Sequence, residues 1–196
     1  MVWPVVGHDL GMSTGAPSGR NQIDPFGDGH RIPGHRAATL TGNRDYGDSW
    51  IYCDMDPSLA LERKYERLFF LDEATALAGG FRPCNRCRRR ALETFKERWV
   101  EGVDPEHRTA EIDQRLREEG TVRKAERPSD LPIGTMIHFE DEYHLIVDGG
   151  MRQWSFTGYG PKVDLPKRRV EVTTPPSTVE ALRSGYEVEL HPSASA

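Results

Sequence analysis

Three cysteines are the residues whose type and spacing best suit a chemical role. Cys84 and Cys87 form a C-x-x-C motif that follows Pro83 and precedes a predicted helix. Such a turn lets both thiolates point at one tetrahedral metal ion at about 2.3 Å, the usual zinc–sulfur distance. Cys53 lies upstream, at the end of a predicted strand. The three thiolates therefore predict a partial ligand set for Zn²⁺.

Two other interpretations of the cysteines stay open. A C-x-x-C pair can be a redox dithiol, although such a pair normally follows a strand of a βαβ unit, and no such unit is evident here. Each cysteine can also be a small buried hydrophobic residue. The odd number of cysteines argues against a disulfide framework and predicts a reducing compartment, which we take to be the cytoplasm.

The spacing does not fix a fourth metal ligand. Asp54 and Asp56 lie near Cys53, and His30 and His35 lie in the Gly- and Pro-rich segment before it. Carboxylate and imidazole groups both bind zinc. A water molecule in the fourth position would instead give the site a catalytic character. Of these two alternatives, we favour a side chain.

A polar turn offers a second candidate site. Asn43, Arg44 and Asp45 lie between two predicted strands. Asn and Asp side chains commonly bond their own backbone in turns, which is the simpler interpretation. The alternative is a polar catalytic group beside the metal. No phosphate-binding loop or nucleophile elbow accompanies these residues, so no mechanism follows from them.

Charge is distributed unevenly along the chain. The sequence has 26 Lys and Arg against 31 Asp and Glu, a net charge of -5, whereas residues 79–100 carry +5. An acidic chain is not an obvious nucleic-acid-binding protein. The basic segment is either a solvated helix face paired with acids elsewhere or a helix N-terminus that contacts phosphate. Its candidate contacts are Arg82, Arg86, Arg88, Arg89 and Arg90.

The sequence around the C-x-x-C motif resembles the zinc-binding domain at the N-terminus of the Ada DNA-repair proteins. Members read F-x-x-x-x-E-A-x-x-x-G-[YF]-R-P-C-x-x-C-R, and FFLDEATALAGGFRPCNRCRR at residues 69–89 is similar. The resemblance extends over residues 37–100 and includes Tyr52-Cys53. It implies a zinc site and an arginine-rich surface beside DNA. Pro57 stands where the family has a further cysteine, so the methyl transfer of Ada is not carried over.

More loosely, the whole chain resembles a family of uncharacterised bacterial proteins of similar length. This second resemblance implies an intact family member and supplies no activity. The segments that carry it are residues 21–27, the Gly42-Asn43-Arg44 turn, the cysteine block, Thr174-Pro175-Pro176-Ser177, Gly185-Tyr186 and His191-Pro192-Ser193-Ala194.

The hydrophobic patterns predict an α+β fold, with an Ada-like zinc module followed by a small, mostly antiparallel β domain. Strands are expected near 37–41, 49–53 and 68–71, and helices at 73–78 and 88–100. After Pro128 the apolar residues alternate with period two. The predicted organisation is a loop-rich arm at 1–36, a metal-binding module at 37–100, a helical linker at 101–127 and a β-rich domain at 128–196.

Several classes of protein are excluded by composition. No apolar run is long enough for a membrane helix, and the first residues lack the basic start of a signal peptide, so we expect no membrane partner. The leading interpretation is a zinc-binding protein that engages nucleic acid, in DNA repair or defence. The alternatives are a metal-dependent hydrolytic enzyme with an open zinc position, and a structural or partner-binding module. The sequence does not set the oligomeric state.

Overall fold

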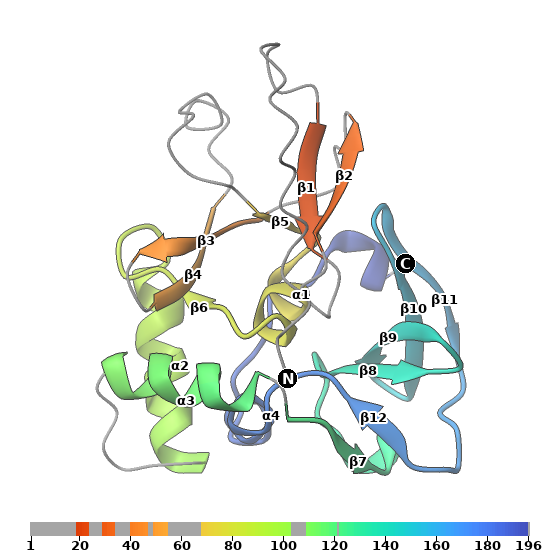
Figure 1. Cartoon of the computed structure of the whole chain (residues 1–196). Coiled ribbons are helices and arrows are strands. Elements are labelled where there is room, and N and C mark those ends of the chain that lie inside the picture. The colour runs from red at the N-terminus through yellow and green to blue at the C-terminus, as the bar shows by residue number, and fades with distance from the viewer. Residues whose placement is uncertain are drawn as a thin grey trace.

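The computed structural model describes residues 19–23, 29–33, 40–46, 49–54, 68–102, 109–120 and 122–195. These residues form two six-stranded sheets, with one short helix between the sheets and longer helices beside them (Figure 1). The α+β prediction is confirmed. In the part of the chain that the structure describes, no helix is both long and apolar enough to cross a membrane.

The first sheet is mixed. β1 pairs with β5 in parallel, as β4 does with β6, and the other neighbours are antiparallel. Strands β1 and β2 fall within residues 1–36, the predicted loop-rich arm; β1 pairs with β5 and β2 pairs with β1, and local alternation does not indicate either strand. In spatial order the strands are β2 (Gly29–Pro33), β1 (Gly19–Ile23), β5 (Leu68–Phe70), β3 (Leu40–Tyr46), β4 (Ser49–Asp54) and β6 (Arg82–Pro83).

Helix α1 (Glu73–Ala78) begins and ends where its sequence predicts. Asp72 is the N-cap, and its Oδ1 accepts a hydrogen bond from the Thr75 backbone N–H at 3.0 Å. Gly79 and Gly80 end the helix, and Gly80 has a φ of 79°, a conformation that favours glycine. Every residue of α1 is buried, because the helix lies between the two sheets.

The longer helices bury the faces that their spacing predicts. Leu92, Phe95 and Trp99 are buried at i, i+3 and i+7, and Ile112 and Leu116 are buried in the next helix. Both helices contact a third one near the C-terminus. The three are α2 (Arg89–Gly102), α3 (Thr109–Glu119) and α4 (Pro176–Arg183).

The second sheet is antiparallel at every pairing, as predicted. Gly149, with a φ of 63°, lies in the tight turn of its central hairpin. In spatial order the strands are β11 (Gly158–Val163), β10 (Gly150–Ser155), β9 (Glu142–Val147), β8 (Met136–Phe139), β12 (Val170–Val172) and β7 (Lys124–Glu126). Two 3₁₀ turns, η2 (Pro128–Asp130) and η3 (Pro192–Ala194), complete the described elements.

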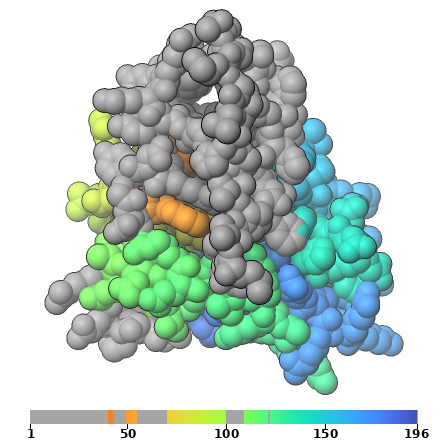
Figure 2. All heavy atoms as spheres, viewed as in Figure 1, coloured from red at the N-terminus to blue at the C-terminus, as the bar shows by residue number. Residues whose placement is uncertain are grey.

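The hydrophobic core does not separate at the predicted boundary near residue 128. One cluster joins Phe70, Phe81 and Phe95 with Leu182 and Tyr186. A second cluster joins α1 to the inner face of the second sheet. Figure 2 shows the green atoms of α3 beside the blue atoms of the C-terminal part of the chain, in keeping with the contacts between α3 and α4. The cysteine-bearing half therefore shares its core with the C-terminal half.

Two consecutive buried carboxylates fasten the C-terminal segment to α1. Glu73 accepts hydrogen bonds from the hydroxyls of Tyr52 and Tyr186, the latter at 2.7 Å, and from the Glu189 backbone N–H at 2.7 Å. Asp72 accepts one from the His191 backbone N–H at 3.0 Å. Residues 186–190 form no strand, and within this segment the Glu189 backbone N–H donates to the Glu73 carboxylate instead of to a neighbouring strand.

Replacing Glu73 by Ala should lower the free energy of unfolding by about 3 kcal/mol, because two buried phenols and one amide lose their acceptor. Urea titration of the purified protein measures this loss. Glu187, an exposed residue two positions before Glu189, gives the control, and its replacement by Ala should cost less than about 0.5 kcal/mol. Equal midpoints for the two variants would show that the Glu73 network does not stabilise the fold.

Candidate metal centre

The pairing of β4 with β6 brings Cys53 and Cys84 together. The register aligns Tyr52 with Pro83, and the Cys84 backbone N–H donates to the Tyr52 carbonyl oxygen at 3.0 Å. A tight turn follows, in which the Arg88 N–H donates to the Cys84 carbonyl oxygen at 3.0 Å, and α2 begins at the next residue. The turn returns Cys87 to the same place, so three thiols from two distant segments meet.

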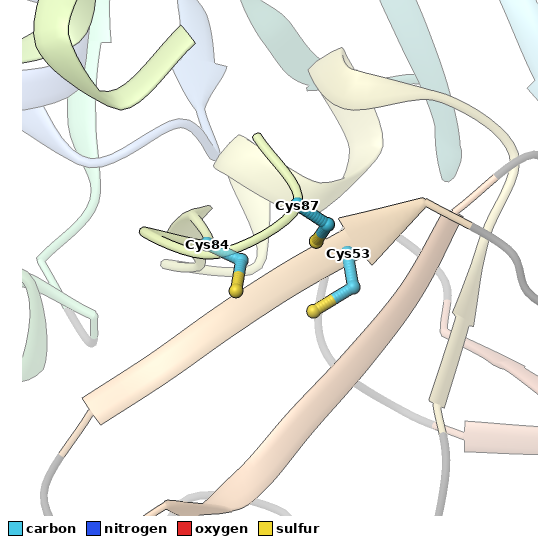
Figure 3. Close-up of side chains that lie close together, drawn as sticks. All are labelled: Cys53, Cys84 and Cys87. Carbon is cyan, nitrogen blue, oxygen red and sulfur yellow. The ribbon is translucent and has the colours of Figure 1, made fainter. Parts of the chain in front are cut away.

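The three sulfur atoms have the spacing of a metal-ligand set. All three Sγ atoms lie within 4.8 Å of one another, and Figure 3 shows the side chains converging on one side of β4. Thiolates that share one tetrahedral zinc ion lie about 3.8 Å apart, given bonds of about 2.3 Å. Cys84 is buried, Cys53 is half-buried and Cys87 is exposed. The cluster can hold a metal ion that is sheltered on one side and reachable on the other.

The surroundings of the thiols suit a cation. Burial, followed by the neighbouring sulfurs of Cys84 and Cys87, raises the pKa of the Cys53 thiol. Burial also raises the pKa of Cys87 and opposes ionisation of Cys84, but the backbone amides of Cys87 and Arg86 lower the pKa of Cys84 overall. The Arg86 N–H lies 3.4 Å from Cys84 Sγ. Three crowded thiolates repel one another, so a divalent ion would supply the charge they need.

Only one of the predicted fourth ligands is placed. Asp54 Oδ1 accepts a hydrogen bond from Arg88 Nη1 at 3.1 Å, and its carboxylate does not belong to the group formed by the three sulfurs. Asp56, His35 and the side chain of His30 lie outside the described residues. Within the ranges that the structure describes, the three thiols are the groups placed to hold a metal ion, and Asp54 as the fourth ligand is not supported.

Two of the five predicted phosphate contacts pair with carboxylates from distant segments. Arg82 is buried, and its guanidinium binds Asp113, so we correct its assignment to the basic surface. The Arg88 side chain is 11% exposed and forms ion pairs with Asp54 and Glu189, while its guanidinium carbon lies 5.5 Å from the centre of the Tyr52 ring. Long-range contacts of this kind leave no signal in the local sequence.

The other three arginines are exposed beside the exposed cysteine. Arg89 forms an i, i+4 ion pair with Glu93 at 2.9 Å, in which both side chains are exposed. Among the described residues, Arg86 and Arg90 form no ion pair. An open cavity of about 480 Å³ lies over this region, and its lining consists of Asp54, Arg86, Cys87, Arg88, Arg89, Arg90 and Ala91. The cavity thus joins one ligand of the cysteine cluster to a concentration of positive charge.

The second candidate site is placed only in part. Asn43, Arg44 and Asp45 lie within β3 rather than in a turn, and the register with β4 is irregular between Asn43 and Tyr46. Their side chains lie outside the described part of the chain, so a catalytic role for them stays a prediction. The buried carboxylate of Asp113, by contrast, was missed because it lies far from the cysteines in the sequence, and Glu73 was noted only as part of the Ada-like motif.

Comparison with known proteins gives no match. No family model, no curated protein and no solved structure matches the chain. The resemblance to the Ada zinc domain therefore stays a prediction, and the geometry of the site carries the functional argument.

Replacing Cys84 or Cys87 by Ser should remove the bound metal, because a cluster of two thiols keeps too few ligands for tight binding. We expect about one metal ion per wild-type chain by elemental analysis. Because metal binding is coupled to folding, chelation should also lower the melting temperature of the wild-type protein and leave that of the Ser variants unchanged. Metal content well below one per chain, with no effect of chelator on melting, would contradict the assignment.

Proposed function

We propose that this protein is a zinc-binding protein that engages nucleic acid, with a role in DNA repair or defence. The proposal rests on the lining of the open cavity, which contains both Cys87 of the cysteine cluster and four arginines. A metal held by the cluster would therefore lie at the edge of a positively charged surface.

The donor set favours zinc. Soft thiolate ligands select Zn²⁺, Cu(I) or iron–sulfur clusters, and tetrahedral sulfur coordination is typical of structural zinc. The C-x-x-C turn before α2 and the resemblance of this segment to the Ada zinc domain both support zinc. When bound, zinc would cross-link β4 to the start of α2 and fix the arginines that follow.

The arginines favour phosphate as the ligand of the cavity. Guanidinium groups bind phosphate oxygens through two parallel hydrogen bonds, and the first residues of a helix add the positive end of its dipole. Arg86 and Arg90 have no competing carboxylate among the described residues, and the exposed pair of Arg89 with Glu93 is weak, at about 0.3–0.5 kcal/mol. A phosphate group can displace a contact of that strength.

The backbone of a nucleic acid is the phosphate-bearing polymer that suits an open cavity. The cavity is not enclosed, and its lining is dominated by arginine and carries one small apolar side chain, Ala91. Such a surface would recognise negative charge rather than the shape of a small molecule. This agrees with sequence-independent contact to the nucleic-acid backbone. The resemblance to Ada supports DNA over RNA.

Reversing the charge of Arg86 and Arg90 to Glu should weaken DNA binding across all sequences. Each phosphate contact contributes a log–log salt slope of about -0.9 on duplex DNA, so the double variant should flatten the slope by about 1.8. A salt titration of duplex DNA and single-stranded RNA binding, followed by fluorescence anisotropy, measures this. Arg88 is left intact because it holds Asp54 and Glu189.

The matched control is the double variant Lys124→Glu and Lys167→Glu. Both lysines are exposed, and both lie in the C-terminal half rather than in the cavity lining, so the net charge changes equally while the cavity stays intact. The control should keep nearly the wild-type slope. The assignment of the arginine cavity as the nucleic-acid contact would be wrong if the wild-type protein did not bind DNA at low salt. It would also be wrong if the two double variants lost the same amount of DNA affinity.

A further inference from the structure

Helix α3 contributes one buried carboxylate that contacts both β4 and β6, the two strands of the candidate metal centre. We propose that Asp113, on α3, is a positioning residue of the metal centre, which it serves through Arg82 and Ser49; this inference rests on the proposed metal-binding function. Among the described residues, Asp113 forms no hydrogen bond to any of the three cysteines, and no motif in its sequence neighbourhood singles it out. Its side chain is 6% exposed.

The carboxylate of Asp113 is fully engaged by these two residues. Its Oδ1 accepts a hydrogen bond from Arg82 Nε at 2.6 Å, and its Oδ2 accepts one from Arg82 Nη2 at 2.9 Å. Oδ2 also accepts one from the Ser49 hydroxyl at 2.6 Å. The pair with Arg82 is the two-pronged arrangement that fixes the guanidinium plane as well as its position.

Each partner of Asp113 lies in a strand that carries or directly precedes a cysteine. Ser49 begins β4, the strand that carries Cys53 near its other end. Arg82 lies in β6, two residues before Cys84, and its third nitrogen, Nη1, donates to the Pro83 carbonyl oxygen at 3.1 Å. One carboxylate thus holds the two strands whose ends supply Cys53 and Cys84, and it fixes the peptide that enters the cysteine turn.

The strand pairing by itself is too short to hold this arrangement. β6 has two residues, and the ladder between β4 and β6 has only two aligned pairs. Because metal ligands must be held within a few tenths of an ångström, groups behind the ligands commonly set metal affinity. A change at Asp113 should therefore alter the geometry of the sulfur cluster, and not only the stability of α3.

The test compares metal binding by wild-type protein, Asp113→Asn and Ser49→Ala, all as the full chain. Zinc affinity is measured by competition with a chromophoric chelator, and the cobalt-substituted proteins are compared by their thiolate charge-transfer and d–d absorption bands at saturating Co²⁺. Removing groups that support metal ligands typically costs 10- to 100-fold in affinity, so the zinc Kd of Asp113→Asn should rise by about that factor. The cobalt bands should shift in the same variant.

Glu119→Gln is the matched control. Glu119 is a buried carboxylate on the same helix, but it accepts hydrogen bonds from the Ser177 backbone and hydroxyl and from Arg115, away from the cysteine strands. Its replacement also removes a buried charged acceptor and should destabilise the fold, yet leave the zinc Kd within about twofold and the cobalt bands unchanged. Urea unfolding of each variant checks that the two variants lose a comparable free energy of unfolding.

The outcomes separate this inference from the proposed function. A wild-type protein that binds no zinc overturns both. A wild-type protein that binds zinc, with the same Kd and cobalt bands in Asp113→Asn, overturns the positioning role alone, as does an equal loss of affinity in Glu119→Gln. If Asp113→Asn does not fold, Ser49→Ala decides: a rise in Kd of about threefold or more supports the role, and an unchanged Kd overturns it.

Discussion

The parallel pairing of β4 with β6 is the contact on which the candidate site depends, because it places Cys53 beside Cys84 across a long stretch of chain. So short a ladder is stabilised from both sides. On one side, Asp113 binds Arg82 and Ser49. On the other, the hydroxyl of Tyr52, the neighbour of Cys53, donates to the buried Glu73. Two buried carboxylates, those of Asp113 and Glu73, therefore hold the two strands through hydrogen bonds.

The same contacts explain how an acidic chain presents a basic surface. The arginines in the cysteine segment outnumber its acids, and carboxylates from distant segments neutralise some of them: Asp113 pairs with Arg82, and Glu189 with Arg88. Arg82 is buried and Arg88 is half-buried. The residual positive charge is thereby concentrated on Arg86, Arg89 and Arg90, at the rim of one cavity, instead of being spread along the segment.

Structural features that depend on a few neighbouring residues could be predicted from the sequence. Features that depend on pairing between distant residues could not. The N-cap at Asp72, the C-x-x-C turn and the hairpin at Gly149 each depend on a few consecutive residues. The convergence of Cys53 on that turn was expected from its residue type, and the structure confirms it. The core that the two halves of the chain share and the Arg82–Asp113 ion pair both depend on residues tens of positions apart. The hydrophobic periodicity of the individual segments does not indicate either of them.

Charge balance at the cavity links the two parts of the proposed function. A Zn²⁺ ion with three thiolates carries a net charge of -1, which by itself repels phosphate, and the Asp54 carboxylate on the same wall adds to that repulsion. Arg88 offsets Asp54 through their ion pair. The exposed arginines must then offset the metal–thiolate group before any of them attracts a polyanion. Arg86, Arg89 and Arg90 outnumber the single negative charge of such a zinc centre, so positive charge would remain for the proposed phosphate contact.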